Sequence, residues 1–254
     1  KTVAPRCVRS KEEAPMAFGS DPRVAPAQVA VDRIDEGLRS YMLSVYNYMG
    51  LGLAITGLVA MFVAATPALY VPIFTTPLKW VVMLAPLGFI FFLSAKISTM
   101  SIGAAQATFW AFAAVMGLSM ASIFLVFTGA SVARVFFITA GMFGAMSLYG
   151  YTTKRDISNW GSFLFMGLIG IIIAMVVNIF LASPALHFAI SVIGVLVFVG
   201  LTAYDTQQIK EMYYSGDGED VVTRKAISGA LRLYLDFINM FVMLLHLFGV
   251  ARGE

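Results

Sequence analysis

Seven long apolar stretches dominate this sequence, and each is close to the length of a helix that crosses a lipid bilayer. Such a helix needs about 20 residues to span the hydrocarbon core. The alternating segments of about ten residues that form membrane β-barrels are absent from the chain. The pattern therefore predicts an all-α polytopic membrane protein with seven transmembrane helices, at about Met42–Thr66, Trp80–Ala95, Ile102–Phe127, Val132–Tyr151, Phe163–Leu181, Leu186–Tyr204 and Leu231–Phe248.

The composition excludes several other classes of protein. Of the 254 residues, 59% are hydrophobic and only 12% are charged, whereas about a quarter of the residues in a soluble domain are charged. The single cysteine, Cys7, excludes a disulfide within the chain and a cysteine-based zinc site. No basic run with interleaved aromatic residues is present, so we expect no nucleic-acid partner.

The first 40 residues differ from the rest of the chain. They contain four of the nine prolines, and residues 1–39 carry seven of the 17 basic and six of the 14 acidic residues. We interpret residues 1–40 as a disordered cytosolic leader with an amphipathic helix near Ala27–Arg39, which would lie on the membrane surface. Met16 is a candidate native start. Residues 41–250 then form the transmembrane domain.

Lysine and arginine residues are distributed unevenly between alternate connections. With the N-terminus inside, fourteen of the 17 lie on the inner side, and only Lys79, Arg134 and Arg252 lie outside. Cytoplasmic loops carry such an excess of basic residues. We therefore expect a cytoplasmic N-terminus and, if all seven helices cross, an external C-terminus. A re-entrant last segment would instead leave the C-terminus inside.

Two carboxylates stand out because an ionisable group in a membrane segment is costly and marks a candidate functional site. Asp205 ends the sixth stretch, in Gly200-Leu-Thr-Ala-Tyr-Asp-Thr-Gln-Gln-Ile-Lys210, and Asp236 lies five residues into the seventh, in Leu233-Tyr-Leu-Asp-Phe-Ile-Asn239. These two stretches are expected to form an antiparallel hairpin joined on the inner side. Both acids then fall in the inner third of the membrane, where they can meet.

Helical spacing indicates how these acids are placed. Arg232, Asp236, Asn239, Met243 and His246 follow one another at intervals of four and three residues and so form one stripe. Thr202 shares a face with Asp205. Because a polar stripe on a membrane helix turns toward protein or water, the last helix is expected to be central and enclosed.

Two carboxylates in contact in a medium of low dielectric constant share a proton and titrate as a pair. Protonated, the pair would clasp two helices; deprotonated, it would repel or recruit a cation. Ca²⁺ prefers oxygen ligands but takes six to eight of them, so binding would be transient, with Asn239, Thr202 and Tyr204 as candidate pore or ion ligands. Alternatively, Asp236 pairs with Arg232 and Asp205 faces water as an interfacial cap.

Other polar and small residues are interpreted as structural. Asn47 and Asn178 are expected to hydrogen-bond between helices, and His187 and His246 to lie near the outer interface without partner acids. The acidic segment Ser215–Asp220 lacks the spacing of an EF-hand and predicts a solvated turn. Close helix contacts are expected at the small residues of the third and fourth stretches, Gly103, Ala104, Ala105, Gly141, Gly144 and Ala145.

The two acid-containing motifs together resemble the signature of the Bax inhibitor-1 family, and the resemblance covers about residues 40 to 250. The family implies six helices around a central seventh, a hydrogen-bonded aspartate pair at Asp205 and Asp236, and a pH-sensitive Ca²⁺ leak. The short loops resemble those of a bacterial, inner-membrane member. In some members an arginine late in the second span latches onto the first aspartate; here Lys96 is the nearest match, and lysine forms a weaker latch.

Three functions compete on this basis. The first is a proton-gated leak for Ca²⁺, with Asp205 and Asp236 as the gate, Lys96 or Arg232 as counter-charge and no cofactor. The second is a non-conducting regulator of a membrane-protein partner, such as a membrane-anchored protease, which would require Ala17–Arg39. The third, an intramembrane aspartyl protease, is disfavoured because Leu233-Tyr-Leu-Asp236 lacks the Gly-x-Gly-Asp setting, so we expect no enzyme.

Overall fold

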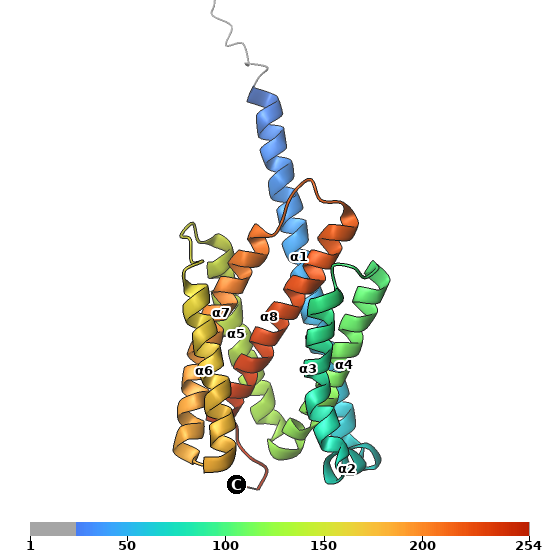
Figure 1. Cartoon of the computed structure of the whole chain (residues 1–254), viewed down its shortest axis with the longest axis vertical. Coiled ribbons are helices and arrows are strands. Elements are labelled where there is room, and N and C mark those ends of the chain that lie inside the picture. The colour runs from blue at the N-terminus through green and yellow to red at the C-terminus, as the bar shows by residue number, and fades with distance from the viewer. Residues whose placement is uncertain (1–23, 254) are drawn as a thin grey trace, which may run out of the picture. The chain divides into compact units, whose positions relative to one another are not determined.

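A computed structural model describes residues 24–253 of the chain, with side chains from residue 36 onward. The described residues form eight helices and no strands: α1 (Val24–Ala65), α2 (Pro67–Thr75), α3 (Leu78–Lys96), α4 (Ile102–Val126), α5 (Gly129–Thr152), α6 (Trp160–Leu181), α7 (Pro184–Glu211) and α8 (Glu219–Phe248) (Figure 1). All except α2 are long and apolar enough to cross a membrane. The predicted all-α fold with seven transmembrane helices is confirmed.

The N-terminal part of the predicted leader, including Met16 and Ala17, lies outside the described residues. Helix α1 begins at Val24, so the segment predicted as a separate amphipathic helix, Ala27–Arg39, is part of one helix that continues to Ala65. Residues 37–254 form one compact unit by themselves, and the description that follows concerns this unit.

Polar caps and prolines explain where several helices begin. The side chains of Ser101, Thr128 and Ser183 accept hydrogen bonds from backbone N–H groups in the first turns of α4, α5 and α7, as N-cap residues commonly do. Pro67 and Pro184 stand in the first turns of α2 and α7, where the missing proline N–H costs nothing. Helix α2, which contains Pro72, was not predicted because it is too short to produce a membrane-length pattern.

The helices that carry the two acids are longer than their apolar stretches. Helix α7 continues past Tyr204 to Glu211, and α8 begins at Glu219, well before Leu231. The predicted bounds were wrong here because hydropathy declines while helix formation continues. Two basic side chains in the first turns of α8 have polar partners. Lys225 pairs with Asp217, and Arg224 donates a hydrogen bond to the Met100 carbonyl over 3.1 Å.

Helix α8 is the most enclosed of the seven long helices. Of its most apolar 18 residues, 61% are buried, compared with 44% for α7 and 11% for α6. It packs against α7, α5 and α4, and Figure 1 shows it crossing obliquely between α7 and α4. An enclosed α8 agrees with the polar stripe predicted along this helix.

The segment after α8 shows that this helix runs the full length of the helix bundle. Thr128 donates its backbone N–H to the Val250 carbonyl over 3.0 Å, and Arg252 donates to the Val126 carbonyl over 2.8 Å. Helix α8 therefore ends beside the α4–α5 connection, at the end opposite its own start. We call the end with the α3–α4, α5–α6 and α7–α8 connections the predicted inner end, and the other the predicted outer end.

Close helix contacts occur at different glycines from those predicted. Gly103, Gly141 and Gly144 have no atom within 4 Å of the position that a Cβ would occupy. In contrast, a Cβ at Gly150 would overlap the Ala203 carbonyl oxygen of α7, and one at Gly117 would overlap the backbone of α1. The prediction was wrong for the three open glycines because their faces of α4 and α5 have no neighbouring helix that close.

Gly150 provides a test of the α5–α7 contact. We expect Gly150→Ala to lower the thermal unfolding midpoint of the detergent-purified protein, because overpacking of this kind costs about 1–3 kcal/mol. The matched control is Gly141→Ala on the same helix, which meets open space and gains helix propensity of up to about 1 kcal/mol. Equal effects of the two changes would contradict the close α5–α7 approach.

The predicted orientation can be tested with single cysteines placed in a Cys7→Ser background. We expect a membrane-impermeant thiol reagent to label Arg252→Cys in intact spheroplasts and Ser215→Cys only after permeabilisation. The reason is that fourteen of the 17 basic residues lie on the side of the α7–α8 connection. If only Ser215→Cys is labelled in intact spheroplasts, the protein has the opposite orientation to the predicted one.

Candidate functional site

Asp205 and Asp236 face one another across the contact between α7 and α8. Their carboxyl groups are close enough to act on each other, and a hydrogen bond between them can form only when one of them carries a proton. Asp236 is only 5% exposed, and its Oδ2 has no hydrogen-bond partner among the described residues. Because a buried polar atom without a partner is costly, this oxygen needs an explanation.

Both acids lie deep within their helices. Since α7 continues to Glu211 and α8 starts at Glu219, Asp205 does not end its helix and Asp236 is far from the start of its own. Asp205 therefore does not cap the end of its helix. Antiparallel packing brings the two side chains together from adjacent helices.

Arg232 is the nearest basic side chain to this pair. Its charge is close enough to act on both carboxyl groups, but the side chain is exposed. Within the described part of the chain, the single ion pair is Lys225–Asp217. The alternative of a direct Arg232–Asp236 ion pair is therefore not found, and Arg232 acts on the acids from a distance.

Lys96 does not contact the pair in this structure. It lies exposed in the last turn of α3 and forms no ion pair within the described residues. The latch that the resemblance suggested is therefore not formed in this conformation.

The other three candidate ligands have different surroundings. Thr202, which is buried, donates its hydroxyl to the Phe198 carbonyl over 2.8 Å, and Asn239 donates Nδ2 to the Leu235 carbonyl over 2.8 Å. Both side chains therefore bond to their own helices. The Tyr204 ring lies against Gly161 at the start of α6, so Tyr204 is directed toward α6.

A chain of hydroxyl groups runs from α1 through α5 to the residue that follows Asp205. The Tyr46 hydroxyl lies 2.6 Å from Ser147 Oγ, which lies 3.0 Å from Thr206 Oγ1, and Thr206 donates to the Thr202 carbonyl over 2.7 Å. Since Thr206 uses its hydrogen on that carbonyl, Ser147 donates to Thr206 and Tyr46 donates to Ser147. The chain thus has one direction, from Tyr46 to α7.

This hydroxyl chain begins on the wall of a crevice between α1 and α5. The crevice has a volume of about 480 Å³, and its polar lining comes from Arg39, Tyr46, Ser147 and Tyr151. Sequence analysis missed this feature, because a tyrosine and a serine in separate membrane helices give no sign that they meet. Their hydroxyl groups within apolar stretches were the only available signal.

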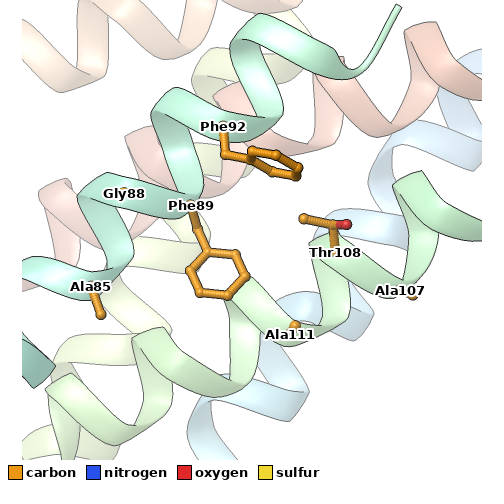
Figure 2. A pocket seen from close by; sticks show the side chains of 7 residues that line it. All are labelled: Ala85, Gly88, Phe89, Phe92, Ala107, Thr108 and Ala111. Carbon is orange, nitrogen blue, oxygen red and sulfur yellow. The ribbon is translucent and has the colours of Figure 1, made fainter. Parts of the chain in front are cut away.

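Two further grooves are apolar and offer little chemistry. In the first, about 580 Å³ between α3 and α4, Phe89 and Phe92 lie opposite Thr108 and Ala111 (Figure 2). The Thr108 hydroxyl donates to the Ala104 carbonyl over 2.7 Å and is thus already satisfied. The second, about 770 Å³, is lined by α1, α4, α5 and α8 and is almost wholly apolar. Such surfaces suit lipid contact.

The residues after Asp205 fasten α7 to the α5–α6 connection. Gln207, only 6% exposed, accepts a hydrogen bond from the Ile157 N–H and donates one to the Arg155 carbonyl, both over 3.0 Å. Lys210 donates to the Tyr151 carbonyl over 2.9 Å. The polar second half of the Gly200–Lys210 motif is therefore a clamp that holds the inner end of α7 in place beside the acid.

The described residues contain no group of three or more His, Cys, Asp or Glu side chains that can hold a metal ion. The acid pair supplies oxygen ligands, which suit Ca²⁺, but far fewer than the six to eight that a resident ion takes. Chemically, the pair can exchange a proton and attract a cation briefly.

Comparison with known proteins places these features in context. The family model described as "Inhibitor of apoptosis-promoting Bax1" matches residues 38–253. The chain is 49% identical to the inner membrane protein YbhL of Escherichia coli K12, over 85% of this chain and 94% of that protein. It is 48% identical to the uncharacterized protein RP147 of Rickettsia prowazekii, over 86% and 92% of the two chains.

Gln207 and its neighbour offer a matched test of the clamp. We expect Gln207→Ala to destabilise the protein by about 1–3 kcal/mol, because the buried Ile157 N–H loses its partner. Gln208→Ala removes only exposed hydrogen bonds, to Ser158 and Glu211, and is expected to change stability by less than about 0.5 kcal/mol. The thermal unfolding midpoint in detergent measures the stability of both variants. Equal midpoints would exclude a stabilising role for the Gln207 hydrogen bonds.

Proposed function

Because this chain belongs to the Bax inhibitor-1 family of membrane proteins, we propose that it is a pH-sensitive leak for cations, with Ca²⁺ as the permeant ion. The gate is the proton shared between Asp205 and Asp236. The observation that carries this proposal is the buried carboxyl pair across α7 and α8, with one oxygen of Asp236 left without a partner among the described residues. The assignment is to a channel and not to an enzyme.

The shared proton controls the force between the two helices. With the proton present, one carboxyl group donates to the other and α7 is held against α8. Without it, two negative charges face each other; at about 4 Å and an effective dielectric constant of about 20, such charges repel by about 4 kcal/mol. That repulsion outweighs a typical hydrogen bond of about 1 kcal/mol, so deprotonation separates the helices or draws in a cation.

A cation drawn to the pair meets oxygen atoms. The two carboxylates supply the charge, and Asn239, which uses Nδ2 for its own helix, keeps Oδ1 available as an acceptor. Water completes the shell. Few protein ligands mean weak binding, and conduction requires that an ion be able to leave the site.

The α1–α5 crevice provides a route for the proton. Its wall carries the first two hydroxyl groups of the Tyr46–Ser147–Thr206 chain, and Thr206 directly follows Asp205 in α7. The chain ends on the Thr202 carbonyl, so a proton would need a water molecule or a rotation of the Thr206 hydroxyl to pass from it to Asp205. With that step, protons reaching the crevice from the predicted inner side have a polar path toward the pair.

Asp156, in the α5–α6 connection, is not a competing sensor. Hydrogen bonds from the Ser158 hydroxyl and backbone N–H hold the pKa of Asp156 below its ordinary value. It therefore stays ionised throughout the neutral range and loses this stabilisation only as the pH falls through its lowered pKa. Asp156 is therefore given no part in the proposed gate.

The inner membrane of a bacterium is the proposed location. The relative YbhL is named as an inner membrane protein, and the distribution of basic residues favours a cytoplasmic N-terminus. In that orientation the acid pair and the crevice lie toward the cytoplasm. The gate then responds to cytoplasmic pH.

Replacement of either aspartate tests the gate. We expect Ca²⁺ flux into proteoliposomes to rise with pH for the unmodified protein, by at most about tenfold per pH unit for one proton. Asp236→Asn and Asp205→Asn should remove this dependence, because an amide can still donate to the remaining carboxylate but cannot lose its proton near neutral pH. A calcium-sensitive dye inside the vesicles measures the flux.

The control is Asp220→Asn, which removes an exposed carboxylate from the first turn of the same helix. It should retain the pH profile of the unmodified protein. The gate hypothesis fails if Asp236→Asn and Asp205→Asn both retain that profile, or if Asp220→Asn flattens it equally.

A further inference from the structure

The chain has two histidines, and the structure brings them together. His187 lies near the start of α7 and His246 in the last turn of α8, so both are at the predicted outer end. Their ring centroids are 4.7 Å apart, with an angle of 57° between the ring planes. Both histidines were predicted at this interface, and their contact with each other is a finding of the structure.

The antiparallel contact of α7 with α8 explains why the rings meet. A Cβ at Gly194 would lie only 3.1 Å from Met243 Sδ, so the two helices approach closely at that point. From there α7 leads back to His187 and α8 leads forward to His246. The two imidazoles are thus held by separate helices. The acid pair lies on the same α7–α8 interface, nearer its other end.

The surroundings of the rings leave their nitrogen atoms available to a ligand. Both histidines are exposed, and in the described part of the chain neither ring takes part in a hydrogen bond or ion pair; Ser191 bonds only to the backbone carbonyl of His187. The angle of 57° between the ring planes shows that the two rings are not stacked face to face. Neither ring is enclosed by other residues, so both are open to a ligand at this end of the two helices.

The spacing fits a single metal ion between the rings. Imidazole nitrogen binds Zn²⁺ at about 2.0–2.1 Å, and two imidazoles on one tetrahedral ion have ring centroids about 5 Å apart. The observed distance of 4.7 Å between the ring centroids would have to widen only slightly for both rings to bind one ion. Imidazole suits Zn²⁺, Cu²⁺ and Ni²⁺, whereas Ca²⁺ and Mg²⁺ prefer oxygen.

We propose that His187 and His246 form a two-imidazole site for a divalent transition metal such as Zn²⁺, which joins the outer ends of α7 and α8. Water occupies the remaining coordination positions, since no third His, Cys, Asp or Glu joins this pair among the described residues. Two protein ligands make the site weaker and more readily exchanged than a structural site with four. The proposal does not depend on ion conduction.

Metal binding is tested by thermal unfolding of the full chain without a polyhistidine tag, in a Cys7→Ser background that removes the only thiol. A ligand that binds the folded state raises the unfolding midpoint. We expect Zn²⁺ to raise it and His187→Gln or His246→Gln to abolish that shift, whereas any effect of Ca²⁺ through the acid pair should be the same in both histidine variants. Asp236→Asn is the matched control and should keep the shift, because the acid pair is a separate site.

Electron paramagnetic resonance with Cu²⁺ provides a second measurement, and its main result comes from the unmodified protein. The unmodified protein should show two coordinated imidazole nitrogens, and each histidine variant one or none. Absence of the two-nitrogen signal, or a Zn²⁺ shift that survives in both histidine variants, overturns the proposal. Loss of the shift in Asp236→Asn alone would move the metal to the acid pair and also overturn it.

Discussion

The contact between α7 and α8 is the interaction on which the other features of this protein depend. It buries Asp236 inside an apolar helix bundle and sets it against Asp205, and ionising both acids there is costly. Helix α8 is also the most enclosed of the long helices. The acid pair therefore lies on the helix that is most enclosed by the rest of the bundle.

Most other buried polar side chains have hydrogen-bond partners, which makes the acid pair conspicuous. Buried hydroxyl groups such as those of Thr139 and Thr202 donate to carbonyls one turn earlier in their own helices, as membrane helices require. Among the described residues, only the Tyr41 hydroxyl and Asp236 Oδ2 are buried side-chain atoms without a hydrogen-bond partner. One of these two atoms belongs to the acid pair, and the other lies on α1.

The same pair of helices presents different chemistry along its length. Toward the predicted inner end it offers carboxylate oxygens, which suit protons and hard cations; at the predicted outer end it offers two imidazoles, which suit softer divalent metals. Between them the helices meet closely at Gly194 and Met243. Beside Asp205, Gln207 fastens α7 to the α5–α6 connection, so movement at the acids is expected to occur against a fixed neighbour.

The sequence by itself determined the number and approximate limits of the membrane helices, the hairpin of the last two, and the two acids as the candidate site. Helix length and hydropathy are local properties, and a carboxylate in an apolar stretch is visible without any neighbour. Only the tertiary structure decided that Asp205 lies inside its helix, that Gly150 and not Gly141 meets another backbone, that Gln207 holds a distant connection, and that His187 meets His246. Each of these depends on which faces of separate helices come together, and that choice is made by packing over the whole bundle.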